Sequence, residues 1–327
     1  MGAATGESIG ANRRGLLASW RRARFGDVLF RVIVAAFGLS VLALAALMLW
    51  QLFFESRESI STFGWGFLAG THWDSVNRVF GAAPAIYGTI VSSLIAVVLA
   101  MPISLGAAIY LSEMAPPWLR HPASFLVESL AAIPSVVFGL WGIYVLVPWI
   151  RDPVERVLGG HLGFLPLFTG PPFGVGMLAA GVILAIMILP IITAIARDSL
   201  LAVPSSQREA MLALGATKWE MISRAVLQYC RSGLVGAVLL GLGRALGETM
   251  AVTMVIGKTY DINTSLFAPA STAASQIASE FSEASFSLYT SALMELALLL
   301  LGITLLVNIA ARLLVWRIAR SPEAIKE

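Results

Sequence analysis

The sequence has little of three residue types, and each shortage argues against a class of protein. Only 13% of its 327 residues are Asp, Glu, Lys or Arg, whereas soluble domains have about 25%. The single cysteine, Cys230, excludes an internal disulfide framework. The three histidines, His72, His121 and His161, lack the spacing of metal ligands. We therefore expect neither a soluble domain nor a disulfide-rich or metal-binding one.

Apolar residues, by contrast, make up 58% of the chain and form long runs. A membrane-spanning helix needs about 20 mainly apolar residues. Six stretches reach that length, namely 28–54, 86–111, 122–150, 174–196, 229–257 and 288–316. The first exceeds the apolar part of a signal peptide, about 7–15 residues, so we expect an uncleaved anchor. The sequence predicts an all-α membrane protein with six transmembrane helices: an N-terminal anchor helix and a five-helix core.

The basic residues are distributed unevenly between the segments that join these runs. If the N-terminus is cytoplasmic, sixteen Lys and Arg fall on the cytoplasmic side and five on the other. The positive-inside rule then places both termini in the cytoplasm. The expected organisation is a basic tail at 1–27, the anchor at 28–54, a periplasmic loop at 55–85, a permease-like core at 86–316 and a tail at 317–327.

Prolines at 102, 134 and 190 interrupt three of the runs, and each should kink or unwind its helix. The segment 132–135 is the best candidate for a broken helix that lines a cavity; a packed kink is the alternative. Outside the spans, Trp65, Phe67 and Trp73 are expected at the membrane interface, and 158–173 is expected to be irregular. The loop 258–287 is expected either to receive a partner protein or to be solvated.

The cytoplasmic loop at 203–228 predicts a helix, a glycine turn and a second helix. Ser206 and Glu209 have the spacing of a capping box. A short helix is expected over 210–214 and should stop at Gly215, which can adopt the left-handed conformation.

Thr217 and Glu220 form a second predicted capping box, which would open the next helix. The loop has more apolar surface than a solvated loop needs, from Met211, Leu212, Leu214 and Trp219. Such a projection suits a helix-in-groove contact with another protein. A helix pair lying on lipid headgroups is the alternative that the pattern leaves open.

This loop resembles the EAA loop of type I ATP-binding-cassette importer permeases, which reads EAA, three residues, Gly, nine residues, I-x-L-P. Glu209, Ala210, Gly215 and Leu227 match it, whereas Met211, Ala225 and Gln228 depart from it. The resemblance implies a MetI-like core and a short helix that docks in a cleft of an ATP-hydrolysing subunit. The residues it implies for docking are Glu209, Ala210, Met211, Leu212, Leu214 and Gly215.

The chain itself is expected to be no enzyme and to bind no cofactor. Gly257-Lys258-Thr259 resembles the end of a P-loop, but the first glycine of that motif would fall at Val252. A P-loop also needs a strand before it and a helix after it. ATP and Mg are therefore expected on a separate partner ATPase.

Two charges lie inside the fifth predicted span. Arg244 and Glu248 are four residues apart, so they should share one helical face. A charge at mid-bilayer costs about 2.5–3.5 kcal/mol on insertion scales, so such residues face a cavity or each other. The donor fork of arginine matches an oxyanion, and Glu248 could hold Arg244 in an ion pair and accept a hydrogen bond from protonated phosphate. The alternative is an ion pair that only fixes subunit packing.

Residues 241–257, GLGRALGETMAVTMVIG, resemble the matching stretch of C-type permease subunits of phosphate-specific (Pst) importers. The similarity extends through 130–142 and 264–285 and covers about 82–316. It implies an inner-membrane importer of inorganic phosphate that works by alternating access, with Arg244 and Glu248 in the substrate pathway. It also implies a heterodimer with an A-type permease, two B-type ATPase subunits and a periplasmic phosphate-binding protein.

Several alternatives remain at this stage. One is an importer of another oxyanion, such as molybdate or sulfate. Another is an ion-coupled secondary transporter, although the inverted repeats typical of that class are not visible. A membrane scaffold or sensor would leave the Arg244–Glu248 pair without a role. Glu128 and Glu295 should either face a water-filled vestibule, or reach the interface or a neighbouring Ser or Thr.

Overall fold

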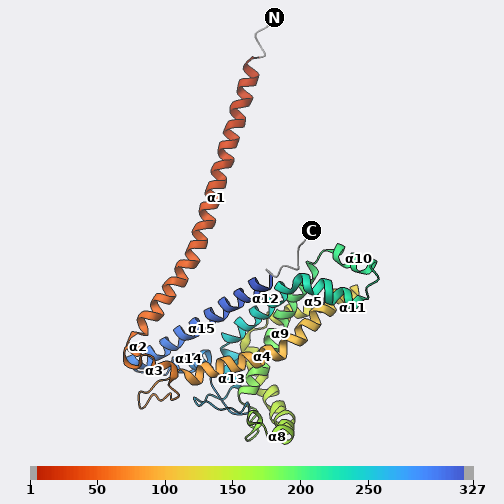
Figure 1. Ribbon diagram of the computed structural model, residues 1–327. Coiled ribbons are helices and arrows are strands. Elements are labelled where there is room, and N and C mark those ends of the chain that lie inside the picture. Colours follow the sequence, from red (N-terminus) through yellow and green to blue (C-terminus); the bar gives the residue numbers. More distant parts are fainter. Residues whose placement is uncertain (1–5, 320–327) are drawn as a thin grey trace. The chain divides into compact units, whose positions relative to one another are not determined.

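Six helical stretches in the computed structural model are long and apolar enough to cross a membrane (Figure 1). They are Asp27–Glu55, Ala83–Met114, Ser135–Leu162, Met177–Leu201, Lys218–Leu246 and Ser287–Trp316. The structure describes residues 6–319, and side chains over 27–316. Its regular elements in that range are all helical, so the predicted all-α protein with six transmembrane helices is confirmed. The basic residues expected at 13–24 and 317–326 lie outside the described side chains.

The chain divides into two units, Met1–Phe54 and Glu55–Glu327, and the first contains nearly all of α1 (Gly6–Glu55). Every side chain from residue 27 to residue 50 is exposed, including Phe30 at 71% and Phe37 at 70%. A helix that is apolar on all sides is normally covered by lipid or by other protein. Residues 28–54 therefore stay predicted as a membrane anchor.

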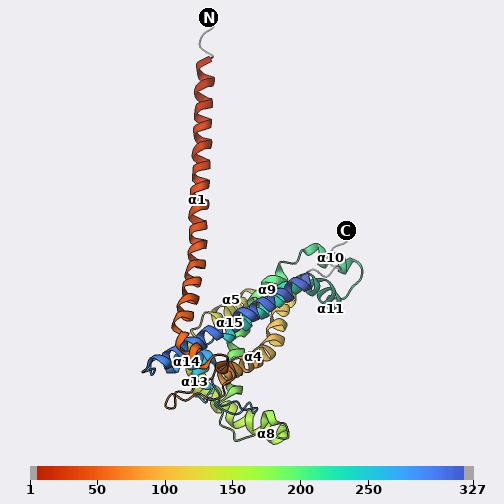
Figure 2. The same cartoon turned by 60° about the vertical axis from the view of Figure 1, so that its left-hand side comes forward.

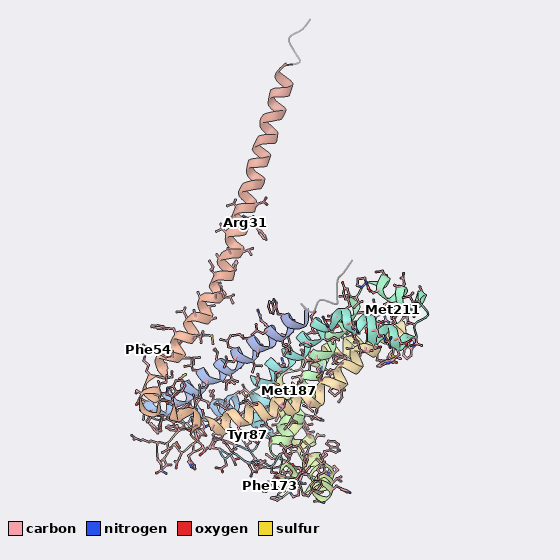
Figure 3. All side chains as sticks on the ribbon, viewed as in Figure 1. Arg31, Phe54, Tyr87, Phe173, Met187 and Met211 are labelled. Carbon is pink, nitrogen blue, oxygen red and sulfur yellow. The ribbon has the colours of Figure 1, made fainter. Side chains whose placement is uncertain are left out.

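The centre of the second unit is formed by α4 (Ala83–Ile109), α9 (Met177–Leu201) and α12 (Leu227–Leu246), which pack on one another. The buried face of α4 consists of small side chains, and a Cβ at Gly181 of α9 would collide with Ile95. Small residues allow such close backbone approach between membrane helices. Met187 of α9 lies midway along this centre, between the ends marked by Met211 and Phe173 (Figure 3).

The third predicted span, 122–150, is wrong in its first half. Residues Pro117–Ala131 form a separate helix, α5, with no buried residue, and the apolar span begins after it with α6 (Ser135–Trp141). It continues through wider π-helical turns and α8 (Arg156–Leu162), so the segment 158–173 is irregular only after Leu162. The break falls where 132–135 was expected, because Pro134 has extended backbone and disfavours helix in the residue before it.

The fifth predicted span, 229–257, is also wrong at both ends. The helical run starts at Lys218 and α12 ends at Leu246, and α13 (Met250–Val255) follows a short break. α13 packs against α6, where a Cβ at Gly139 would lie only 3.1 Å from the Ala251 Cα. The two interrupted helices are thus in direct contact, and glycine permits it.

The loop at 55–85 is more structured than expected. It contains α2 (Arg57–Phe63) and α3 (Gly66–Ala69). Phe67 and Trp73 were predicted at the membrane interface, but both are buried in a second hydrophobic cluster with Phe80 and Tyr289. Only Trp65, at 87% exposure, keeps an exposed position. Phe67 lies in α3, which packs on α4, and the Trp73 ring packs on Phe80 and on Tyr289 of α15 (Ser287–Ala319).

The loop at 258–287 folds back into the protein. It contains α14 (Ala273–Glu280), which packs on α4, α13 and α15. Gly88 of α4 makes room for this segment, because a Cβ there would collide with the Ser271 carbonyl oxygen. The expectation of a merely solvated loop is wrong for α14, since its residues 273–276 are buried.

Candidate functional site

The loop expected to dock an ATPase contains α10 (Ser205–Ala213) and α11 (Lys218–Glu220). Both lie at one end of the second unit, and α8 lies at the other end in two views (Figures 1 and 2). Pro204, with extended backbone, is the N-cap of α10, and no side-chain hydrogen bond caps it. The predicted Ser206–Glu209 capping box is therefore wrong, because the helix already begins one residue before Ser206.

The end of α10 has the conformation that the sequence predicts. Gly215 has φ +81°, in the left-handed region, and its N–H donates to the Leu212 carbonyl at 3.0 Å. The predicted Thr217–Glu220 capping box is also confirmed. The Glu220 N–H donates to Thr217 Oγ1 at 3.3 Å, and the Thr217 N–H donates to Glu220 Oε2 at 2.9 Å. The turn between the two helices is thus fixed by local interactions.

An apolar surface is exposed on this turn. Leu214 is 84% exposed, Trp219 70% and Leu212 50%, whereas Met211 is half-buried against the core. A recess of about 400 Å³ lies beside them, between α10 and the start of α12, and Ala210 lines it. Clustered large apolar side chains in an exposed turn indicate a contact surface. Either a groove on another protein or the lipid headgroups could cover this apolar surface.

Arg208, on the inner side of α10, is one of the sixteen basic residues that the positive-inside rule places on the cytoplasmic side. Its Nη2 donates to Glu113 Oε1 at 2.7 Å and its Nε to Glu113 Oε2 at 3.2 Å. It also donates to the carbonyls of Val203 and Leu200, at 2.5 and 2.9 Å. Glu113, at the end of the span that contains α4, is only 6% exposed. In the sequence, the one signal that could have indicated this pair is Glu113 itself, a single carboxylate just after the apolar run 86–111.

Arg244 and Glu248 do not share a helix as predicted. Arg244 lies in the last turn of α12 and is exposed, whereas Glu248 lies in the break before α13. Glu248 Oε1 accepts from the Ala251 N–H at 3.5 Å, and no ion pair with Arg244 occurs among the described side chains. The predicted intrahelical pair is wrong, because the helix ends at Leu246 and the chain turns away at Gly247.

The break itself opens onto a recess within the membrane-spanning part. This recess has a volume of about 420 Å³, and its lining is mainly apolar, with Gly247 on one side and Thr304 and Asn308 of α15 on the other. Arg244 sits near the C-terminal end of α12, where a cation interacts favourably with the helix dipole. Arg244 has no carboxylate partner among the described side chains, and a guanidinium beside a helix break could bind a passing anion.

Glu128 and Glu295, for which the sequence left alternatives open, have different surroundings in the structure. Glu128 of α5 pairs with Arg197 of α9 at 2.9 Å, a partner that the sequence did not predict, and both side chains line an open recess of about 340 Å³. Glu295 is 7% exposed and lies beside Ser59 of α2, so it does not reach the interface. Its neighbour is a serine, one of the two alternatives considered. Glu128 thus joins α5 to α9 through an ion pair, and Glu295 lies where α15 packs on α2.

Glu280, which the sequence presents only as an acidic loop residue, is the centre of a buried polar cluster. Its carboxylate accepts from Trp73 Nε1 at 2.6 Å, from the Tyr289 hydroxyl at 2.7 Å and from the Tyr260 hydroxyl. Burial and the hydrogen bond to Glu280 raise the pKa of the Tyr260 phenol, so it remains a donor. A recess of about 680 Å³ adjoins the cluster and is also lined by Lys258. The cluster ties α14 to the loop that contains Trp73.

The chain is similar to known proteins in both sequence and structure. The family described as "Binding-protein-dependent transport system inner membrane component" matches residues 100–320. A "Phosphate transport system permease protein PstC" of Haemophilus influenzae is 47% identical over 299 residues, 90% of this chain and 95% of that protein. The protein of the same name from Mesorhizobium japonicum is 45% identical over 95% of this chain and 97% of its own length.

Solved structures show the same fold at lower sequence identity. The MetNI methionine ABC transporter in an inward-facing conformation has a TM-score of 0.53 at 21% identity, over 72% of this chain and 95% of that one. A bacterial ABC transporter involved in import of the acidic polysaccharide alginate has a TM-score of 0.58 at 16% identity, over 88% and 98%. At these identities the similarity concerns the fold alone. It confirms the predicted MetI-like permease fold.

Proposed function

Because this chain belongs to the family of binding-protein-dependent transport system inner membrane components, and within it to the PstC permeases, we propose that it translocates inorganic phosphate in an ATP-driven importer. The observation that carries the proposal is 45–47% identity to phosphate permeases over at least 90% of the chain. The family is that of the membrane component, so this chain is a permease subunit and not the enzyme that hydrolyses ATP.

The partners follow from this role. An external phosphate-binding protein delivers the anion, a second permease of A type completes the passage, and two B-type ATPase subunits supply the energy. Both termini face the cytoplasm of a bacterial inner membrane, since sixteen basic residues against five favour that side. ATP and Mg bind on the ATPase subunits.

The ATPase docks on the turn between α10 and α11. The docking residues are Glu209, Ala210, Met211, Leu212, Leu214 and Gly215. The exposed apolar side chains of Leu212 and Leu214 and the recess beside Ala210 support this role. An apolar helix face that enters a groove is a recurrent mode of protein recognition, and a soluble ATPase would cover the surface that is exposed in the single chain.

Phosphate passes Arg244, whose guanidinium has no carboxylate partner in the described part of the chain. The planar donor fork can hold two phosphate oxygens at once. Glu248, which lies just beyond it in the break, accepts a hydrogen bond from protonated phosphate, a bond that sulfate does not donate at neutral pH. An importer of sulfate or molybdate remains the competing proposal, and it differs in this contact.

Uptake of radiolabelled phosphate tests the pathway. We expect Arg244→Gln to abolish uptake by the assembled importer, whereas Arg244→Lys retains part of it because the charge remains. Arg156→Gln, in an exposed pair with Asp152, is the matched control and should keep normal uptake.

Two results would contradict the proposal. Normal uptake by Arg244→Gln would exclude this residue from the pathway. Uptake that excess phosphate does not inhibit, but excess sulfate or molybdate does, would reject phosphate as the substrate. For Glu248→Gln we expect weaker discrimination between phosphate and sulfate, measured by competition.

A further inference from the structure

Arg208 is the only residue of α10 whose described side-chain hydrogen bonds reach the helices of the membrane core. Its guanidinium binds both carboxylate oxygens of Glu113, at 2.7 and 3.2 Å. The same guanidinium donates to the carbonyls of Leu200, in the last turn of α9, and Val203, two residues after the helix ends. One side chain therefore joins the cytoplasmic loop to the ends of two central helices.

The burial of this contact distinguishes it from an ordinary surface ion pair. The Glu113 side chain is 6% exposed and the Arg208 side chain 21%. A bidentate, charge-assisted pair fixes the direction of both groups as well as their distance. The last carbonyls of a helix have no partner within it, so Arg208 also caps α9. The contact is therefore a rigid connection, here called the joint, between α10 and the ends of the helices that contain Glu113 and Leu200.

The opposite side of the same turn is exposed and apolar, at Leu214 and Trp219. A force applied there by a bound ATPase has to reach α4 and α9, which pack on each other along their length. Met211 gives α10 an apolar contact with the core, but apolar contacts slide more easily than a bidentate pair.

We propose that the Arg208–Glu113 pair is the joint through which movement of α10 reaches α4 and α9, so that both are positioning residues for ATP-driven transport. This inference rests on the proposed function, because it requires an ATPase on the α10 turn. Loss of this ion pair uncouples ATP hydrolysis from transport. The ATPase still binds and hydrolyses ATP, but less phosphate crosses the membrane per ATP.

The test is the ratio of phosphate imported to ATP hydrolysed by the complete importer in proteoliposomes. We expect Arg208→Ala and Glu113→Gln each to lower this ratio about fivefold or more, the lower end of typical coupling between sites. The double variant should lose no more than Arg208→Ala, because the two residues act as one unit. Arg208→Lys keeps the charge without the fork and should retain an intermediate ratio.

Arg197→Ala is the matched control. Arg197 pairs with Glu128 at 2.9 Å, its side chain is 12% exposed, and it has no described hydrogen bond to α10. Its loss should leave the ratio unchanged. An equal fall in the control would show that any broken pair in this region uncouples transport, and would overturn the inference.

A merely structural role gives a different result. If Arg208→Ala or Glu113→Gln lowers the yield of assembled importer but keeps the wild-type ratio, the inference is wrong. Glu113→Gln preserves the shape of the side chain and provides the measurement if the alanine variant fails to assemble. If the unmodified chain binds no ATPase, or hydrolysis does not respond to the phosphate-loaded binding protein, then the proposed function fails instead.

Discussion

Replacing Glu280 by alanine tests whether the buried polar cluster holds α14 in place. The substitution removes the acceptor for three donors, from Trp73, Tyr260 and Tyr289. Glu280 itself is 4% exposed, so its carboxylate loses nearly all contact with solvent on folding and accepts these three hydrogen bonds in exchange. The loss of stability therefore depends mainly on what happens to the three donors.

The magnitude follows from which donors water can reach. A buried donor without an acceptor costs about 1–3 kcal/mol. Tyr260 is half-buried and lines the recess of about 680 Å³, so water can replace Glu280 there. Tyr289, at 5% exposure, and Trp73, which also lines the recess but is only 8% exposed, are more deeply buried. Two unsatisfied donors give an expected loss of about 2–6 kcal/mol in the free energy of unfolding.

Thermal unfolding of the purified chain in detergent, followed by tryptophan fluorescence, measures this loss. A change of 1 kcal/mol shifts the Tm of a soluble domain of 150–250 residues by about 2–4 °C, so we expect a fall of at least about 4 °C. Glu283→Ala is the control, since its carboxylate is 65% exposed and lies 4.0 Å from Lys258. It should change stability by less than about 0.5 kcal/mol.

A double-mutant cycle sharpens the test. In the Glu280→Ala background, Trp73→Phe removes a donor that already lacks its acceptor, so its further effect should be smaller than in the unmodified chain. Equal Tm values for Glu280→Ala and the Glu283→Ala control would refute the reasoning. Additive effects of Glu280→Ala and Trp73→Phe would show that their hydrogen bond contributes nothing.

Three further substitutions test single positions. Gly88→Val should displace the α14 segment and lower the Tm by several degrees, because its Cβ would collide with the Ser271 carbonyl; an unchanged Tm would contradict this packing. Gly215→Val should lower the free energy of unfolding by about 1–2 kcal/mol, because valine is strained in the left-handed conformation. It should also abolish stimulation of ATP hydrolysis by the phosphate-loaded binding protein, and retained stimulation would reject the docking role. Thr217→Ala should cost about 0.5–2 kcal/mol through loss of the cap to Glu220, and Thr217→Ser should restore the Tm if the hydroxyl is the cause.

Local features of the docking turn could be predicted from the sequence because they depend on spacing over a few residues. The left-handed stop at Gly215 and the Thr217–Glu220 box involve groups at most three or four residues apart. The Ser206–Glu209 box has the same spacing, yet it does not form. Pro204 cannot donate a backbone hydrogen bond and starts the helix one residue earlier, so the spacing no longer corresponds to a helix start.

The helix breaks were predictable only in part. Pro134 marks the first break, because proline and the residue before it disfavour helix wherever they occur. The second break, at 247–249, has no proline and lies in an apolar run. Its position depends on α13 packing against α6 at Gly139, a contact between segments more than 100 residues apart. The Arg244–Glu248 pair was predicted wrongly for the same reason.

Apolar run length was thus enough to predict an all-α membrane protein with six spans, since lipid imposes that requirement on each segment independently. The partners of the buried charges were decided only by the tertiary structure. Arg208 meets Glu113 across 95 residues, and Trp73 meets Glu280 across 207. A charge taken out of water needs a partner, but which partner it finds depends on which helix ends the fold brings together.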